Sequence, residues 1–249
     1  KAFQEIIKKA LDVYNADIVN GGTYHNFKDF FGFPNPAETN LSNETLTPLP
    51  HPVLGNCDSI LKEIEKKDQL LHYPYQSFEP LIKLLEEAAI DPEVTTIKMT
   101  IYRAASESRL NDAIVTAAKN GKKVVVFIEV KARFDERNNL KWGQIFEDNG
   151  ATVIYSFPDI KIHSKILYIE KKTDDGKQRY GYIATGNFNE KTAKLYTDFG
   201  LMTADKKITK DLNKVFLVLQ QKLLVPKTKR LLVSPYTTRS GFTELVQTE

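Results

Sequence analysis

The sequence predicts an α/β protein with a mixed, largely parallel sheet that is flanked by helices and preceded by a helix. Two patterns predict this class. Between residues 94 and 156, apolar strand-like runs alternate with amphipathic segments of about three turns, which indicates right-handed βαβ crossovers between parallel strands. Further on, two strand-like runs flank a polar turn that contains Gly176, which is typical of an antiparallel hairpin.

The first expected element is a helix over residues 2–14, because its apolar side chains recur at helical spacing. From residue 15 to 52 this periodicity disappears while glycine and proline recur, so we expect a long connector of the kind that joins domains or carries function. A short amphipathic helix is expected near residues 59–66. Another is expected to begin near Ser77, a capping residue, and to run to about Ile90.

The alternation of strands and helices begins after Asp91-Pro92. The expected strands are 94–102, 123–131 and 151–156, and the expected helices are 111–120 and 138–149, closed by Gly121 and Gly150. The run 123–131 is apolar almost throughout, as in strands that are buried on both faces. The elements expected after these are hairpin strands at 161–172 and 179–185, a strand at 196–203, a helix at 205–224 and the beginning of a strand at 229–233.

The composition fits one or two soluble globular domains. The 249 residues are 41% hydrophobic, with 35 basic and 32 acidic side chains and one cysteine, which argues against disordered, collagen-like and disulfide-stapled chains. No run of 18 apolar residues and no signal segment occurs, so neither a membrane-spanning protein nor a secreted precursor is expected. Cys57 by itself cannot form an internal disulfide or a multi-cysteine zinc site, which suits a reducing cytoplasm. The net charge of +3 identifies no partner.

The residues most specific for chemistry are His163 and Lys165, followed by Gly186, Asn187 and Asn189. Residues two apart on a strand point to the same face, so His163 and Lys165 should act together. A neutral histidine nitrogen can attack phosphorus, and an ammonium beside it can stabilise the phosphoryl oxygens as charge develops. Asn187 and Asn189 can donate amide hydrogen bonds to the same oxygens. The plainer interpretation is an ordinary strand with a solvated lysine, which the second motif makes less favourable.

The two motifs carry a family resemblance. His163-x-Lys165 followed by Gly186-x-x-Asn189 is similar to the motif of the phospholipase D superfamily, whose histidine forms a covalent phospho-enzyme. The acid five residues after the lysine is Glu170 here, where that superfamily has aspartate. More narrowly, seven blocks occur in the order seen in bacterial polyphosphate kinases, which the chain resembles over nearly its whole length: 24–30, 71–75, 100–103, 131–136, 161–165, 185–189 and 195–198.

This resemblance implies roles for individual residues. His163 would accept the terminal phosphate of ATP and pass it to polyphosphate, Arg103 and Arg133 would lie in the phosphate and magnesium region, and Tyr196 would contact the nucleotide. The residues themselves agree, because each arginine follows a predicted strand, where ligands of open α/β sheets gather, and a guanidinium grips phosphate in a bidentate way. A guanidinium has no lone pair for a metal, so the implied cofactor, Mg²⁺, is expected to arrive bridged by ATP phosphates.

The resemblance also divides the chain into three parts: the end of a helical head domain with its connector (1–49), a first phospholipase D-like catalytic domain (50–230) and the start of a second such domain (231–249). The ends of the chain favour a piece of a longer protein, because it begins at Lys1 without an initiator Met and stops inside the helical-looking run 242–247. The implied partners are ATP or ADP and inorganic polyphosphate, with no nucleic acid. The full-length protein is expected to be a cytoplasmic homo-oligomer with no transmembrane segment, which leaves room for peripheral membrane association.

The function that this reasoning favours is a polyphosphate kinase that works reversibly through a phosphohistidine, with Mg²⁺. Phospholipid- or nucleic-acid-cleaving phosphodiesterases of the same superfamily, and a non-catalytic polyanion-binding module, are the alternatives. The 249-residue chain is expected to have little activity by itself, because phospholipase D-like sites lie between two domains. Activity should fall below about pH 6 to 6.5 if the pKa of His163 has its usual value.

Other singled-out residues have structural interpretations. His25, His51 and His72 lie in aromatic or proline-flanked segments, where structural hydrogen bonds are expected. Trp142 is expected in the core.

Overall fold

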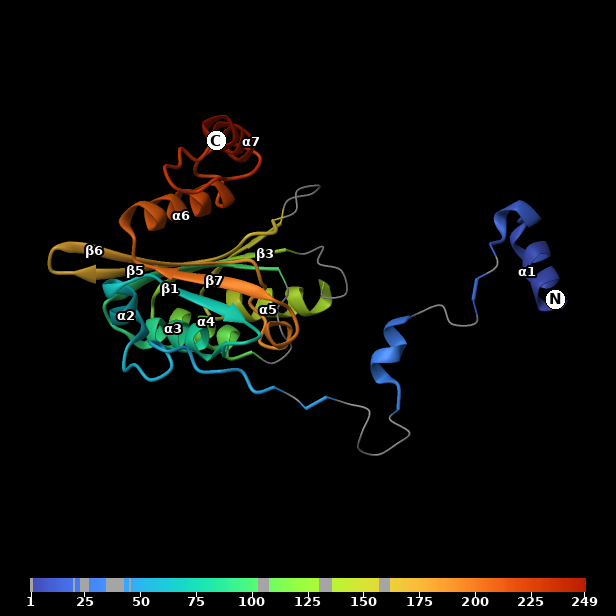
Figure 1. Ribbon diagram of the computed structural model, residues 1–249, viewed down its shortest axis with the longest axis horizontal. Helices are drawn as coiled ribbons and strands as arrows, with labels where there is room; N and C mark the ends of the chain where they lie inside the picture. Colours follow the sequence, from blue (N-terminus) through green and yellow to red (C-terminus); the bar gives the residue numbers. More distant parts are fainter. Residues whose placement is uncertain are drawn as a thin grey trace. The chain divides into compact units, whose positions relative to one another are not determined.

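The computed structural model describes residues 2–19, 21–22, 27–34, 43–44, 46–102, 108–129, 136–156 and 162–249. The chain forms two compact units, Lys1–Leu46 and Thr47–Glu249, which are drawn in Figure 1. Each unit is described by itself.

The first unit contains short helices. They are α1 (Ala2–Leu11) and two 3₁₀ helices, η1 (Asn15–Asp17) and η2 (Phe27–Gly32). The predicted first helix is therefore confirmed over most of its length, and it ends where Asp12 has a positive φ of 51°. None of its residues is buried. The connector expected after it contains the two 3₁₀ helices, which apolar periodicity cannot reveal because each is so short.

The second unit is built on one sheet. Its strands are β1 (Gln69–Tyr73), β2 (Val94–Ile101), β3 (Lys123–Ile128), β4 (Thr152–Tyr155), β5 (Lys165–Thr173), β6 (Gly176–Ala184) and β7 (Asp198–Thr203). Its helices are α2 (Ile60–Lys66), α3 (Glu79–Ile90), α4 (Arg109–Lys119), α5 (Glu136–Asp148), the 3₁₀ helix η3 (Thr192–Lys194), α6 (Lys206–Leu219) and α7 (Thr238–Thr248). Within the described residues, the strand order is β1-β7-β6-β5-β2-β3-β4.

The mixed α/β class is confirmed, but the expectation of a largely parallel sheet is wrong. Among the strands that the structure describes, the parallel pairs are β2–β3 and β3–β4, the part with βαβ crossovers. The hairpin of β5 and β6 pairs antiparallel with β2, and β7 and β1 extend the sheet in the same antiparallel manner. The reason is that β5 returns beside β2 without a helical crossover, so each later strand runs opposite to its neighbour.

Helices cover both faces of the sheet (Figure 1). On one face α2, α3, α4 and α5 bury the larger apolar core, and on the other face α6 closes a smaller one. Alternate residues of β5 serve the two cores: Leu167 and Ile169 belong to the larger, Ile166 and Tyr168 to the smaller. This alternation follows from the period of two in a strand. It places Lys165 on the face of the larger core, whereas His163 lies two residues before β5, which begins at Lys165 and not at residue 161 as predicted.

Three elements of the second unit differ from the sequence prediction. Strand β1 and the 3₁₀ helix η3 are additional to it, and the strand expected at residues 229–233 does not form. The backbone amides of Lys229 and Arg230 donate instead to Asp211 Oδ2 on α6, over 2.6 and 2.7 Å. The expected cap, Ser77, is not the N-cap of α3, because Phe78 occupies that position. Ser77 lies one residue before Phe78, where its Oγ accepts the Glu79 amide over 3.1 Å.

Candidate active site

Three strand ends meet at one edge of the sheet, and they carry Tyr102 after β2, Glu129 after β3 and His163 before β5. We call this place the His163 edge. Strands β2 and β3 are parallel, so both end here, and β5 is antiparallel to β2, so it begins here. The Glu129 amide donates to the Ile101 carbonyl over 2.9 Å, which continues the sheet up to this edge. The topology therefore brings together residues that are far apart in the sequence.

His163 and Lys165 form a close pair of reactive side chains among the described residues at this edge. Lys165 is 4% exposed, and its Nζ lies 2.9 Å from His163 Nδ1 and also donates to the His163 carbonyl. The Tyr102 ring meets the His163 ring edge-on at 5.1 Å between centroids, and Lys165 Nζ lies 5.2 Å from the Tyr102 centroid. Lys165 is thus held by an imidazole nitrogen, a carbonyl and an aromatic face. The plainer interpretation, in which the Lys165 side chain is solvated, is therefore wrong.

The surroundings of His163 favour the neutral form of its ring. Burial, and then the nearby positive charge of Lys165, lower the pKa of His163 below its ordinary value of 6.5. Both causes disfavour the imidazolium, which is the charged form. A neutral imidazole keeps one lone pair in the plane of the ring, so His163 has at pH 7 the protonation state that a nucleophile needs.

Gly186 makes room for a carboxylate from the neighbouring strand. A Cβ added at Gly186 would lie 2.5 Å from Asp198 Oδ2 and 2.8 Å from Asp198 Cβ. Asp198 Oδ1 accepts a hydrogen bond from Thr185 Oγ1 over 2.8 Å, which fixes the carboxylate in this space. The glycine of the motif is thus explained by the close approach of β7.

Asn189 and Asn187 differ in what their side chains do. Asn189 Oδ1 accepts the backbone amides of Lys191 and Thr192 over 3.0 and 3.1 Å, so it stabilises the turn that leads into η3. Its amide nitrogen is the end that can still donate to a ligand. Asn187 Oδ1 is buried and has no hydrogen-bond partner among the described residues.

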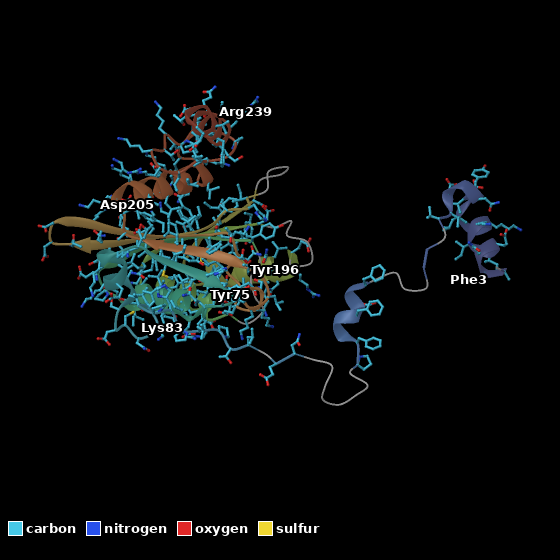
Figure 2. The ribbon with its side chains drawn as sticks, viewed as in Figure 1. Phe3, Tyr75, Lys83, Tyr196, Asp205 and Arg239 are labelled. Atoms are coloured by element: carbon cyan, nitrogen blue, oxygen red, sulfur yellow. The ribbon has the colours of Figure 1, made fainter. Side chains whose placement is uncertain are left out.

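The structure describes only some of the residues that the sequence predicts to bind nucleotide or phosphate. Tyr196, labelled in Figure 2, lies between η3 and β7 with 62% of its surface exposed. A tyrosine so exposed is available for stacking. Arg103 and Arg133 lie outside the described residues, so their positions relative to His163 stay predictions.

Two buried polar residues at the His163 edge were missed by sequence reasoning. They are Glu129, whose Oε2 accepts the Ile162 amide over 3.0 Å, and Asn139 on α5, whose Nδ2 donates to the Glu129 carbonyl over 2.8 Å. A sequence signal existed for the first, because Glu129 is the one acid within the apolar run 124–130. Asn139 gives no such signal, since it looks like any polar position of an amphipathic helix.

Comparison with known proteins shows the family of this chain. A family model described as polyphosphate kinase C-terminal domain 1 matches residues 59–224. The polyphosphate kinase of Klebsiella pneumoniae is 43% identical over 249 residues, which cover 100% of this chain and 36% of that relative. That of Escherichia coli strain K12 is 43% identical over 251 residues, with the same two shares.

The chain belongs to the polyphosphate kinase family.

The resemblance predicted from the seven sequence blocks is therefore confirmed. The crystal structure of the polyphosphate kinase from Porphyromonas gingivalis superimposes with a TM-score of 0.78 at 37% identity, over 96% of this chain and 40% of that chain. This chain spans about a third of the length of its curated polyphosphate kinase relatives, 36% for the proteins of Klebsiella pneumoniae and Escherichia coli.

Glu170, which occupies the position of the superfamily acid, does not lie beside His163 in this polyphosphate kinase chain. It lies on the opposite face of β5, where it receives hydrogen bonds from Lys177 Nζ over 2.6 Å and from Tyr168 Oη over 2.9 Å. Burial acts to raise the pKa of Glu170, but these hydrogen bonds outweigh it and the pKa is lowered. Glu170 thus belongs to an ion-pair network on the far face of the sheet.

Two of the other histidines have structural contacts. His51 accepts the Leu54 amide at Nδ1 over 3.1 Å, and its Nε2 lies 3.2 Å from the Leu70 carbonyl, so the expected structural hydrogen bonding is confirmed. His72 stacks on Phe199 at 4.4 Å between ring centroids, while its Nε2 has no hydrogen-bond partner among the described residues. Stacking, and not the expected hydrogen bonding at Nε2, is what the structure shows for His72. His25 lies outside the described residues.

The donor set of the described residues fits a magnesium ion held mainly by substrate phosphates. No group of three or more His, Cys, Asp or Glu side chains occurs in the described part of the chain, so nothing there resembles an all-protein cage. Mg²⁺ commonly binds through one or two carboxylates together with substrate phosphates and water, and Asp198 is a half-buried carboxylate close to the Gly186 loop. No helix of the described residues is both long and apolar enough to cross a bilayer.

Proposed function

We propose that the protein containing this chain reversibly transfers the terminal phosphate of ATP to inorganic polyphosphate through a phosphohistidine at His163. The observation that carries this proposal is the buried Lys165 ammonium 2.9 Å from the His163 ring, whose lowered pKa keeps it neutral. Membership of the polyphosphate kinase family supports the substrates.

Two in-line displacements make up the reaction. An unprotonated nitrogen of His163 attacks the γ-phosphorus of ATP. The N–P bond forms as the bond to the β,γ-bridging oxygen breaks, and ADP leaves with that electron pair. A terminal oxygen of polyphosphate then attacks the phosphohistidine, the N–P bond breaks and the neutral imidazole returns. Each step exchanges one bond to phosphorus for another, which is consistent with a reversible reaction.

Lys165 has to change partners during the first step. As an ammonium it donates to Nδ1, so the ring proton of neutral His163 lies on Nε2. Attack by Nδ1 needs the lone pair that Lys165 occupies, and attack by Nε2 needs the ring proton to move to Nδ1. In both cases Lys165 must release the ring. The γ-phosphate oxygens offer it a negatively charged acceptor at that moment, where it stabilises the developing charge.

The remaining roles rest on the family resemblance. Arg103 and Arg133 would bind phosphate oxygens, Asn187 and Asn189 would donate amide hydrogen bonds to them, and Tyr196 would contact the nucleotide. Mg²⁺ would neutralise the triphosphate when it is bound with ATP. The exposure of Tyr196 and the free amide end of Asn189 support their assignments.

The same proposal covers the setting of the intact protein. We place it in the cytoplasm as a homo-oligomer that uses ATP or ADP and inorganic polyphosphate, and not nucleic acid.

The test compares substrates and histidine variants of the intact protein. With ATP and Mg²⁺ we expect ADP release and polyphosphate formation, at least about 10³-fold slower in His163→Gln and unchanged within about threefold in the control His72→Gln. Hydrolysis of a phosphodiester in the absence of ATP would support a phosphodiesterase instead. Polyphosphate binding without turnover, equal in parent and His163→Gln, would support a non-catalytic module.

A further inference from the structure

The backbone on both sides of His163 is held by two buried side chains, one on β2 and one just after the end of β3. On the amino-terminal side, Glu129 Oε2 accepts the Ile162 amide over 3.0 Å. On the carboxy-terminal side, Thr100 Oγ1 donates to the Ser164 carbonyl over 2.8 Å. The two contacts hold one donor and one acceptor of the peptide groups that flank His163.

Both holding side chains are themselves fixed. Glu129 and Thr100 are each 2% exposed, and a buried polar group without a partner would be costly, so each contact is strongly favoured. Thr100 Oγ1 also accepts the Ile166 amide over 3.1 Å, so the hydroxyl both donates and accepts.

Asn139 connects this arrangement to helix α5. Its fully buried side chain uses Nδ2 to donate to the Glu129 carbonyl over 2.8 Å and to the Tyr102 carbonyl over 3.0 Å. Tyr102 is the residue whose ring packs against the His163 ring. The Asn139 amide group therefore links the ends of β2 and β3, and it also holds the backbone of Tyr102, whose ring contacts the imidazole of His163.

We propose that Thr100, Glu129 and Asn139 are positioning residues, which hold the backbone and the aromatic neighbour of His163 so that its imidazole is aimed at the phosphate. This inference rests on the proposed function for its kinetic consequence. None of the three residues needs to touch the substrate. Displacing a reacting group by about 1 Å can cost on the order of 100-fold in rate, so loss of a holding contact should lower the rate of phosphoryl transfer more than it weakens ATP binding.

The first test is a pair of Glu129 variants in the intact protein, with rapid-quench measurement of phosphohistidine formation. Glu129→Ala should slow this step about 10- to 100-fold while the Kd for ATP changes less than about threefold. Glu129→Gln keeps a carbonyl oxygen that can accept the Ile162 amide, so it should recover the rate to within about threefold of the parent. A Glu129→Gln rate as low as that of Glu129→Ala would overturn the proposal.

The second test uses a matched pair of threonines. Thr100→Val removes the hydroxyl that holds the backbone beside His163. Thr203→Val is the control: it removes a similarly buried hydroxyl, at the last residue of β7, that donates to Asp68 Oδ1 over 2.7 Å. Both should lose similar stability in urea unfolding. Only Thr100→Val should slow phosphohistidine formation, by about tenfold. Equal slowing in both variants would mean a merely structural effect and would contradict the inference.

A third readout separates failure of this inference from failure of the proposed function. The rate at which diethyl pyrocarbonate modifies His163, followed against pH by peptide mass spectrometry, reports the pKa of the ring and needs no turnover. In Glu129→Ala the ring should leave Lys165, and the pKa should move up towards 6.5. If the parent forms no phosphohistidine, the proposed function fails and this titration still decides the positioning role. An unchanged titration would then reject it.

Discussion

At the residue scale, Lys165 acts on two different groups at different times. In the structure it donates to His163 Nδ1 and helps to lower the pKa of the ring. In the proposed reaction it turns to the phosphoryl oxygens. In that proposed reaction the same buried charge would favour the neutral nucleophile before the attack and stabilise the transition state during it.

Replacing Lys165 should therefore change both the rate and its pH dependence. Because the neutral ring attacks, the rate falls as pH drops through the pKa of His163, which lies below 6.5 in the parent. Lys165→Gln removes the second cause of that lowering while burial remains, so the acid limb should move to higher pH, towards 6.5. The plateau rate should fall about 10²- to 10³-fold.

The control is Lys172→Gln, an exposed lysine near the other end of β5. Its pH–rate profile for phosphohistidine formation should match that of the parent. An acid limb that stays in place in Lys165→Gln would show that the lysine charge does not act on His163.

The close approach of Gly186 and Asp198 predicts a steric effect of Gly186→Ala. The added Cβ would overlap with the Asp198 carboxylate, which is held by Thr185, so we expect a loss of about 1–3 kcal/mol in the free energy of unfolding. Urea unfolding of a double-mutant cycle with Asp198→Gly tests the cause. The cost of Gly186→Ala should be smaller when residue 198 is glycine, and equal costs in both backgrounds would exclude this clash.

At the scale of elements, Asp211 links α6 to the segment that follows it. Burial acts to raise the pKa of Asp211, but the amides of Arg230 and Lys229 and the side chain of Lys214 outweigh this, so the pKa is lowered from 3.8. The folded protein therefore favours the carboxylate. Its contribution to stability is present above pH 3.8 and is lost as the pH falls through the lowered value.

Asp211→Asn should accordingly destabilise the protein by about 1–3 kcal/mol at pH 7, because the buried carboxylate accepts more than one amide. Chemical unfolding at several pH values would measure this. The difference in the free energy of unfolding between Asp211→Asn and the parent should shrink below pH 3.8. The control, Asp174→Asn in the exposed β5–β6 turn, should have little effect on stability at any pH. A difference that does not depend on pH would contradict the assigned role of the charge.

Most elements of the second unit could be predicted because each is decided by local pattern. The apolar strand β3 and the amphipathic helix α4 are examples, with Gly121 at a positive φ of 76° just after α4. Strand β1 was missed because it has five residues, and one of its two outward side chains, Leu70, is apolar, so its alternation is weak. The strand order was not predictable, because the pairing of β5 with β2 joins residues about 70 positions apart.

The candidate site was predictable to the extent that single side chains carry the chemistry. His163, Lys165 and the Gly186 motif stand out in the sequence through residue type and spacing. Glu129 and Asn139 act on backbone groups of distant segments, so their importance depends on the tertiary structure. The hydrogen bonds of Asn189 to the turn before η3 likewise depend on the folded structure.

At the scale of the whole molecule, the second unit has an apolar core of its own. The proposed site, in contrast, need not be formed by the residues of this unit alone. The larger core extends from Leu54 to Met202. The described residues contain one His-x-Lys pair, and the chain spans 36% of the length of its relatives. In the phospholipase D-like arrangement that the motif resembles, the site lies between two domains.

We therefore expect the 249-residue chain by itself to be soluble and folded but nearly inactive. The measurement is ATP-dependent polyphosphate synthesis by the chain and by the intact protein at equal molar concentration, together with the urea unfolding of the chain. Cooperative unfolding with synthesis at least about 10³-fold below that of the intact protein is the expected result. Robust synthesis by the chain would show that its own residues suffice for the site.

The central claim is that His163 carries the phosphoryl group, and locating the covalent label tests it most directly. The intact protein is incubated with Mg²⁺ and ATP labelled in the γ-phosphate, quenched in base and mapped by peptide mass spectrometry. We predict an acid-labile, base-stable phosphate on His163 that is chased into polyphosphate or, on addition of ADP, back into ATP. Label on another residue, or turnover without any label on His163, would contradict the account.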